Sequence, residues 1–386
     1  MITRYRNRSM RPSTSGKLVG GIGVALAMLG ATPAMASHIV TTADLRTACQ
    51  TSPGHVVVLD HAVSILDGAR PPSTEQVLTG CTIVLGSNAK LEAQRISMTF
   101  AGPLVVESAD KAEVKLSMSF FSAPSVNFNL TGAGSAIETT LSGIHATAGG
   151  LLITMGDQSK LIVLERLLPG PSDALAATTT VQIRGGQQFT GQLNEMGISA
   201  PQGIEISMNG AEGLLKVEQT RFTAAQGNIG IAASGTKGQL EMSESNLQFG
   251  NMLSIRLAGA DSLLKMKQTS AGGASSTQDA PGGLLIESGS GAAANGKIEV
   301  SEVSFFNVAS IRLLGSLDGL QGGLKMEKSR ISASGAIVME TGAQGVTEAK
   351  ENSGGAATLF RVAAGAGGKC IGQPNSFFAP VMQICP

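Results

Sequence analysis

A repeat of about two dozen residues constrains the fold of this chain more than any other feature. Five segments share one pattern, in which an apolar residue opens the unit and a second follows two places on. The openers are Leu215, Leu240, Leu264, Ile298 and Leu324, and the second residues are Val217, Met242, Met266, Val300 and Met326. Five places after the openers stand Thr220, Ser245, Thr269, Val303 and Ser329. Seven places after them stand Phe222, Leu247, Ala271, Phe305 and Ile331. The openers are 25, 24, 34 and 26 positions apart, so the step is regular apart from one longer turn.

This period predicts a solenoid, because each repeat of such a chain buries its apolar face only by stacking on its neighbours. The spacing of two inside each unit is the period of a β-strand. A second short alternating stretch and a Gly-rich turn precede each unit, as in GIEISMNG and NIGIAASG. We therefore predict an all-β fold, a single-stranded parallel β-helix solenoid of about ten to eleven coils with a short N-terminal capping helix. The alternative is an antiparallel β-sandwich, which has no reason to repeat the same four positions in register.

One outward-facing residue lies between the first two apolar positions of each unit. These residues are Lys216, Glu241, Lys265, Glu299 and Lys325. If coils stack about 4.8 Å apart, the column is a ladder of alternating charge, in which opposite charges attract modestly. The ladder supports the register of the repeat and gives these charges a structural role.

The same template recurs less clearly outside residues 215–331. Upstream units open at Val114, Ile137, Leu161 and Leu193, which puts Ser119, Ser142, Arg166 and Ile198 in the small polar column. Residues 166–180 and 269–283 are too long for tight corners and are predicted to protrude as loops, which in solenoids often lie on the binding face. After Met339 the pattern fades, with one more coil expected around Phe360 and Val362.

Residues 1–36 have the composition of a secretory signal peptide. A basic start is followed by an apolar run over 18–29 and by Ala34, Met35 and Ala36, the small residues of a cleavage site. The apolar run is too short to span a membrane, so we expect a mature chain that begins at Ser37 and has no integral membrane segment. We expect an exported protein that is periplasmic, on the outer surface or extracellular. The predicted domains are 1–36 (signal peptide), 37–98 (N-terminal cap and first coils), 99–365 (β-helix coils) and 366–386 (disulfide-stapled C-terminal cap).

The four cysteines fit an oxidising compartment. Cys49 and Cys81 lie near the mature N-terminus, and Cys370 and Cys385 lie at the C-terminus. The simplest pairing is within each end, which would staple the two ends of the solenoid, although the sequence alone leaves the connectivity open. A redox-active pair is the alternative, but neither pair has the C-x-x-C spacing.

Residues 42–60 predict how the solenoid begins. Thr42 is a candidate N-cap, residues 43–49 form helical turns, residues 52–54 end them, and HVVVLD is the first strand. A short amphipathic helix followed by Pro-Gly and an apolar strand resembles the N-terminal part of right-handed parallel β-helix proteins of the pectin-lyase-like kind. The resemblance spans most of residues 40–365, rests on period and pattern, and implies a right-handed coil.

Side chains that carry chemistry are sparse. The histidines, His38, His55, His61 and His145, have none of the spacings of metal motifs, and no nucleotide-binding or nucleophile motif occurs. We therefore predict no catalytic, metal-binding or cofactor-binding residue and no cofactor. The acid–imidazole pair Asp60 and His61 is expected in a turn, and Arg256 and Arg312, at similar positions in two coils, are expected on a solvated face.

The resemblance also implies an alternative, because many β-helix proteins act on polysaccharides. Lyases of that kind use clustered Asp with calcium and an Arg base, and hydrolases use paired Asp or Glu. Here the Asp residues are scattered, at Asp44, Asp60, Asp67, Asp110, Asp157, Asp173, Asp261, Asp279 and Asp318. The formal net charge is zero, so no overall field attracts nucleic acid, and aromatic residues are only 3% of the chain.

From these features we expect a secreted or periplasmic, non-catalytic β-helix protein with a structural, binding or adhesion role. Its expected partner is a polysaccharide or another cell-envelope protein, and no nucleic acid. The alternative is a carbohydrate-active β-helix enzyme, a polysaccharide lyase or a glycoside hydrolase.

Overall fold

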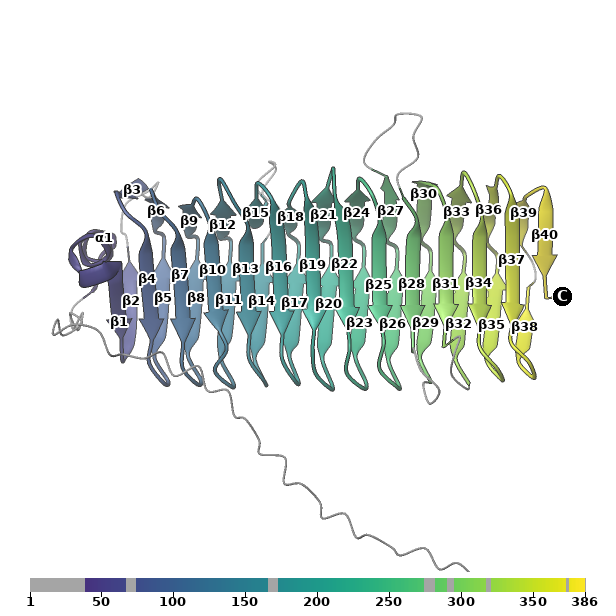
Figure 1. Cartoon of the computed structure of the whole chain (residues 1–386), viewed down its shortest axis with the longest axis horizontal. Helices are drawn as coiled ribbons and strands as arrows, with labels where there is room; N and C mark the ends of the chain where they lie inside the picture. Colours follow the sequence, from purple (N-terminus) through teal and green to yellow (C-terminus); the bar gives the residue numbers. More distant parts are fainter. Residues whose placement is uncertain are drawn as a thin grey trace, which may run out of the picture. The chain divides into compact units, whose positions relative to one another are not determined.

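The computed structural model describes residues 39–66, 74–165, 173–273, 282–289, 295–316, 321–372 and 375–385. These residues belong to one compact unit, residues 33–386. Within them the chain passes in turn through three sheets, here called A, B and C, and each strand pairs in parallel with the strand three further along (Figure 1). One strand from each sheet makes one coil. The predicted parallel β-helix is therefore confirmed, and the antiparallel sandwich is excluded.

The strands are short and similar in length in all three sheets. Sheet A consists of β1 (Val56–Leu59), β4 (Cys81–Leu85), β7 (Leu104–Ser108), β10 (Val126–Leu130), β13 (Leu151–Met155), β16 (Thr180–Gly185), β19 (Gly203–Met208), β22 (Asn228–Ala233), β25 (Leu253–Leu257), β28 (Leu284–Ser288), β31 (Ile311–Gly315), β34 (Ile337–Thr341), β37 (Leu359–Ala364) and β40 (Val381–Ile384). Sheet B consists of β2 (Ala62–Leu66), β5 (Lys90–Gln94), β8 (Glu113–Ser117), β11 (Ala136–Thr140), β14 (Lys160–Leu164), β17 (Thr190–Asn194), β20 (Leu214–Glu218), β23 (Gln239–Ser243), β26 (Leu263–Lys267), β29 (Lys297–Ser301), β32 (Gly323–Glu327), β35 (Val346–Lys350) and β38 (Lys369–Ile371). Sheet C consists of β3 (Thr74–Val77), β6 (Ser97–Phe100), β9 (Phe120–Ala123), β12 (Gly143–Ala146), β15 (Leu175–Ala177), β18 (Gly197–Ser199), β21 (Arg221–Ala224), β24 (Asn246–Phe249), β27 (Ser270–Gly273), β30 (Ser304–Val308), β33 (Arg330–Ala333), β36 (Ser353–Ala356) and β39 (Ser376–Phe378).

The solenoid has more coils than the ten to eleven that the sequence predicts. Sheets A, B and C contain 14, 13 and 13 strands in the described ranges. The additional coils lie near the two ends, where small or polar residues replace part of the apolar template, as in β5 with Ala93 and β35 with Thr347 and Ala349. All three side chains are buried, because the strand period and the register continue through these coils.

The inward-facing columns form one continuous core. Leu215, Leu240 and Leu264 pair with one another in register, and all three are buried. The small polar column is also buried and lies at the corner between sheets B and C. There the backbone N–H of Thr220 donates to Ser245 Oγ at 3.2 Å, and Ser245 Oγ donates to the carbonyl of Ser243 at 2.7 Å. The hydroxyls therefore satisfy corner backbone groups that a core of hydrocarbon alone would leave unpaired.

The predicted register of one upstream unit is wrong. Leu193 pairs with Val163 and Val217, so it is the second apolar residue of its unit, and Met196 rather than Ile198 occupies the corner position. The opener is Gly191. The ring of Phe189 fills the space that a side chain at residue 191 would occupy, because its Cε1 would lie 3.1 Å from a Cβ at that residue. The apolar residue therefore stands two places before the opener position, so the repeat pattern cannot be recognised there.

The two predicted loops are shorter than the sequence suggested. β15 and β27 take up part of residues 166–180 and 269–283. Residues 166–172, which include Arg166, and residues 274–281 lie outside the described residues.

The predicted charge ladder on sheet B is confirmed. Lys216, Glu241, Lys265, Glu299 and Lys325 lie in direct register on successive strands. Lys216 Nζ is 3.6 Å from Glu241 Oε2. The same column already alternates upstream, with Glu92, Lys115 and Glu138, which the sequence analysis did not include.

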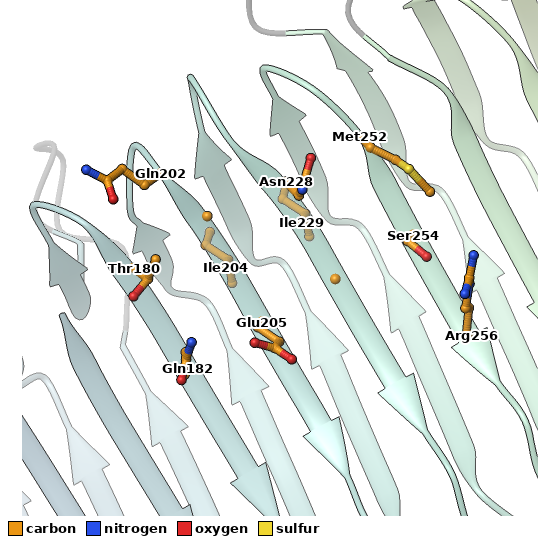
Figure 2. Close-up of a pocket in the computed structure, with 12 residues that line it drawn as sticks. Thr180, Gln182, Gln202, Ile204, Glu205, Asn228, Ile229, Met252, Ser254 and Arg256 are labelled. Atoms are coloured by element: carbon orange, nitrogen blue, oxygen red, sulfur yellow. The ribbon is translucent and has the colours of Figure 1, made fainter.

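Sheet A shows the same columnar order on its outer face (Figure 2). Gln182 of β16 pairs with Glu205 of β19, which is followed in register by Gly230 of β22 and Ser254 of β25. Inward neighbours such as Ile204 and Ile229 are buried. Each coil therefore adds one outward side chain to the column, and a small residue leaves a gap in it.

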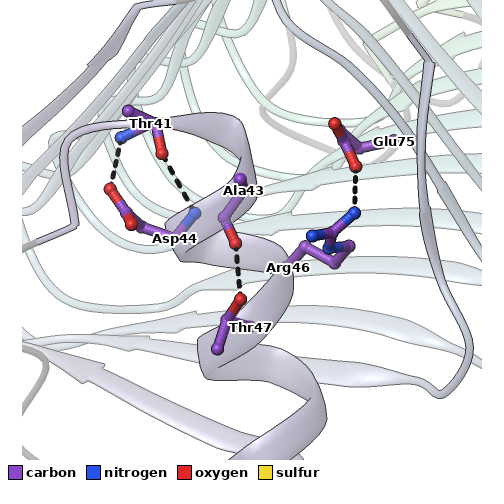
Figure 3. Close-up of polar contacts among 6 residues, drawn as sticks. All are labelled: Thr41, Ala43, Asp44, Arg46, Thr47 and Glu75. Atoms are coloured by element: carbon purple, nitrogen blue, oxygen red, sulfur yellow. Dashed lines mark hydrogen bonds and ion pairs between the residues drawn. The ribbon is translucent and has the colours of Figure 1, made fainter.

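The N-terminal end is closed by the helix α1 (Thr42–Thr51), which the 3-10 turn η1 (Pro53–His55) follows. The N-cap is Thr41, one residue before the predicted Thr42 (Figure 3). Asp44 N–H donates to Thr41 Oγ1 at 3.1 Å and Thr41 N–H donates to Asp44 Oδ2 at 2.9 Å, a reciprocal capping box that only Thr41 can form. Arg46 also binds Glu75 of sheet C, with Nη1 2.5 Å from Oε2 (Figure 3).

The two disulfides join residues within each end, as the simplest pairing predicts. Cys49 bonds Cys81, and Cys370 bonds Cys385, with Cα–Cα distances of 5.2 and 5.3 Å. The first staple ties α1 to β4, and the second ties β38 to the residue after β40. Among the described residues no helix has both the length and the apolar character needed to cross a membrane.

Candidate functional site

A shallow trough on the outer face of sheet A is the first candidate site. It has a volume of about 460 Å³ and crosses the strands β16, β19, β22 and β25 (Figure 2). The trough exists because Gly230 presents no side chain between Glu205 and Ser254 in the outward column. A Cβ added at residue 230 would have its nearest neighbour, Ile204 O, at 4.0 Å. The gap is therefore open space and not a close approach between backbones.

The trough is lined by hydrogen-bonding groups with little net charge. Its polar side chains are Thr180, Gln182, Gln202, Glu205, Asn228, Ser254 and Arg256. Figure 2 shows them spread over neighbouring strands, from Thr180 and Gln182 across Glu205 to Ser254 and Arg256. Of these side chains, Glu205 contributes one negative charge and Arg256 one positive charge. The others are amides and hydroxyls, which both donate and accept hydrogen bonds. Such a surface suits a ligand with many hydroxyl or amide groups.

Arg256 and Arg312, which the sequence places at similar positions in two coils, do not share a column of sheet A. Arg256 is in register with Glu287, whereas Arg312 is in register with Leu285, two positions earlier. Arg256 Nε lies 3.8 Å from Glu287 Oε2. Arg256 is therefore partly neutralised at the edge of the trough, and no paired-arginine anion site forms.

A second cavity, of about 410 Å³, lies at the corner where β11, β14 and β17 end. It is lined by Thr140, Leu141, Leu164, Glu165, Asn194 and Glu195. Glu165 is half-buried, and its Oε2 has no hydrogen-bond partner within the described part of the chain. Burial, together with the nearby Asp173 carboxylate, raises the pKa of Glu165 to about 7. A carboxyl group with this pKa holds a proton near neutrality and can donate or accept it.

The residues around Asp173 form a polar cluster beside this cavity. Arg221 Nη2 lies 3.2 Å from Asp173 Oδ1, and the Asp173 carbonyl is 2.8 Å from His145 Nε2. The His145 ring meets Phe120 edge-on with a centroid distance of 4.6 Å. These contacts fix the end of β12 against the start of β15, whereas the carboxyl groups of Glu165 and Glu195 line the cavity.

Three further aspartates and one histidine bond to neighbouring residues at turns and corners of the solenoid. Asp110 and Asp157 accept hydrogen bonds from the backbone N–H of Ala133 and Gln187 in the next coil, at 2.9 and 2.8 Å, so they fix corners of the solenoid. His61 Nδ1 lies 2.6 Å from Asp60 Oδ1 on an exposed turn, and this contact lowers the pKa of Asp60. Across the ranges described, no group of three His, Cys, Asp or Glu side chains is placed to hold a metal ion. His38, Asp67, Asp279 and Asp318 lie outside those ranges.

Sequence reasoning missed both candidate sites. Gly230 had a visible signal, because glycine inside a strand often marks a position where another molecule or backbone approaches closely. The sequence contains no comparable signal for Glu165, because its environment is formed by residues from three coils and by Asp173, which lies beyond the insertion that follows β14.

The chain matches no protein-family model, and searches of curated proteins and of solved structures also find no match. The resemblance to pectin-lyase-like proteins is therefore one of architecture, supported by the parallel coils alone.

Proposed function

We propose that this protein is an exported, non-catalytic β-helix that binds an extended, uncharged and hydroxyl-rich chain, such as a polysaccharide, along the trough of sheet A. The observation that carries the proposal is the trough itself, an open channel across four strands with amide and hydroxyl walls. Hydrogen bonds from such groups, repeated every 4.8 Å or so along the solenoid, suit a polymer better than a compact ligand.

Gly230 provides the sharpest test of this binding role. Gly230→Leu fills the trough without a steric conflict, because the added Cβ enters open space. Affinity for a panel of neutral polysaccharides, measured by affinity electrophoresis or calorimetry, should fall about tenfold or more. Val338→Leu, an outward position of the same column on β34, is the matched control and should leave affinity unchanged. Equal effects of the two substitutions, or no binding to any glycan in the panel, would contradict the proposal.

The second candidate function is a glycoside hydrolase, favoured by one observation. Glu165 has a pKa of about 7 and shares a cavity with the carboxyl group of Glu195, and hydrolases of this class use one protonated and one ionised carboxyl. Release of reducing ends from any polysaccharide by the purified protein, abolished by Glu165→Gln, would favour this function. We expect no release.

Export is part of the proposal, and the two disulfides are compatible with it. Intact mass spectrometry of the protein recovered from its native compartment should give a chain that begins at Ser37. A cell-associated protein that retains residues 1–36 and has reduced cysteines would contradict export.

A further inference from the structure

The outer face of sheet B carries a block of six alternating charges. They occupy the middle outward position of the successive strands β20 to β35 (Figure 1): Lys216, Glu241, Lys265, Glu299, Lys325 and Glu348. Uncharged residues follow the block in register at both ends, Gln192 on β17 and Ile371 on β38. Four of the six charged residues are exposed and two are half-buried, so the face is open to a partner.

The order of these charges is complementary to itself when it is reversed. The block begins with a lysine and ends with a glutamate, so a second copy turned end for end sets every positive charge against a negative one. The facing pairs are Lys216 with the partner's Glu348, Glu241 with the partner's Lys325, and Lys265 with the partner's Glu299. A two-fold axis that lies in the interface, parallel to the strands and midway between β26 and β29, produces this arrangement. An axis along the solenoid would instead set each charge against its own copy, which is repulsive.

The two outward columns beside the block fit the same axis. Because the axis keeps the direction of the strands, each column faces itself in reversed order. Glu218 then faces the partner's Lys350, and Leu214 faces the partner's Val346, an apolar residue that is 41% exposed. The other facing pairs are Gln239 with the partner's Gly323, Leu263 with the partner's Lys297, Ser243 with the partner's Glu327, and Lys267 with the partner's Ser301. Across the three columns of these described strands, no facing pair sets like charges together.

The charges of the block are also able to take a second partner. Lys216 Nζ lies 3.6 Å from Glu241 Oε2, which is longer than a charge-assisted hydrogen bond. The upstream block of the same column lacks the complementarity, because Glu92, Lys115 and Glu138 are odd in number and read the same when reversed. The self-complementary pattern is therefore a property of the strands β20 to β35.

We infer that this face of sheet B is a dimer interface and that its partner is a second copy of the chain, packed antiparallel about this axis. Six strands about 4.8 Å apart and about 17 Å long cover on the order of 500 Å² per copy. A total of about 1,000 Å² is at the lower limit for specific interfaces and indicates a weak dimer. The trough lies on sheet A, another face of the solenoid, so the inference does not rest on the proposed function.

Sedimentation equilibrium of the purified protein tests this inference. We expect a dimer with a dissociation constant of roughly 100 µM, which should rise several-fold between about 50 mM and about 500 mM salt, because exposed ion pairs are screened. Lys265→Glu and Glu299→Lys should each weaken association about tenfold, since each substitution sets two like-charged pairs against each other across the axis.

Combining these two substitutions separates the interface from the ladder within one chain. A mixture of the two variants should regain the dimer, because the introduced glutamate of one then faces the introduced lysine of the other. A double variant with both substitutions should dimerise like wild type for the same reason, although it breaks the alternation within each chain. Lys115→Glu is the control, since it breaks the ladder equally but lies outside the interface, and it should not change association.

Circular dichroism of every variant checks that the β-helix remains folded. A monomeric wild-type protein, open-ended polymers, a mixture that stays monomeric, or an equal loss of association in Lys115→Glu would overturn the inference. Glycan binding does not enter this measurement, so its outcome is independent of the proposed function.

Discussion

At the scale of single residues, position in a column decides what each side chain does. A serine that faces outward in sheet A, such as Ser254, lines a trough, whereas Ser245 faces inward at a corner and holds two backbone groups. The sequence gives both the same identity, and only the register separates their roles. The register of residues 215–331 was readable from the sequence, because leucine or isoleucine marked every opener.

Ser245→Ala should therefore destabilise the protein by about 1–3 kcal/mol, since it leaves the Thr220 N–H buried without an acceptor. Urea unfolding measures this change. Ser254→Ala, on the exposed face, is the control and should change the free energy of unfolding by no more than about 0.5 kcal/mol. Equal effects would mean that the corner hydroxyls are not part of the core.

Glu165 predicts a specific pH dependence of stability. Its pKa is about 7 in the fold and near 4.5 as an unperturbed group. Between these values the unfolded chain ionises while the folded protein keeps the proton, so this group lowers stability as the pH rises from about 4.5 to 7.

Glu165→Gln should remove this loss. Because the group is only half-buried, we expect the variant to gain about 1 kcal/mol or less relative to wild type at pH 8. At pH 4, where the carboxyl is protonated in both states, the gain should vanish. Thermal or urea unfolding at the two pH values checks this, and a difference that is the same at both would refute the protonated assignment.

At the scale of elements, the strands were predictable and the corners were not. Alternating apolar residues such as Leu240 and Met242 allow the strands of sheet B to be predicted. One coil has glycine, Gly191, at the opener position, and Phe189 from the preceding turn fills the space of its side chain, so the register of that coil could not be predicted. The Glu165 cavity could not be foreseen, because it forms only when three corners stack. The helix α1 was predicted one residue late at its N-cap, because the capping box depends on Asp44 rather than on the first Thr-Ala step.

The C-terminal staple should stabilise its own coil most strongly. In the chain-entropy model a loop of 15 residues contributes about 3 kcal/mol. In a Cys370→Ala, Cys385→Ala double variant, hydrogen exchange should accelerate in β38 and β40. The central strands β20 and β23 should keep their protection, because solenoid coils contact mainly their neighbours. A uniform loss of protection along the solenoid would contradict this local role.

At the scale of the whole described solenoid, one rule produces the candidate surfaces. Residues about two dozen places apart stack in direct register, so a glycine on one coil becomes a trough and alternating charges become a ladder. The proposed binding role depends on this stacking.

The most direct test of the stacking is a set of spin-label distances along the charge ladder. Lys115, Lys216 and Lys325 lie in one column, with Lys216 four coils from each of the other two. Nitroxide pairs measured by double electron–electron resonance on protein diluted with unlabelled chain should give about 19 Å for 115–216 and for 216–325, and about 38 Å for 115–325, at 4.8 Å per coil. Distances that do not add along the column would contradict the parallel register on which the account depends.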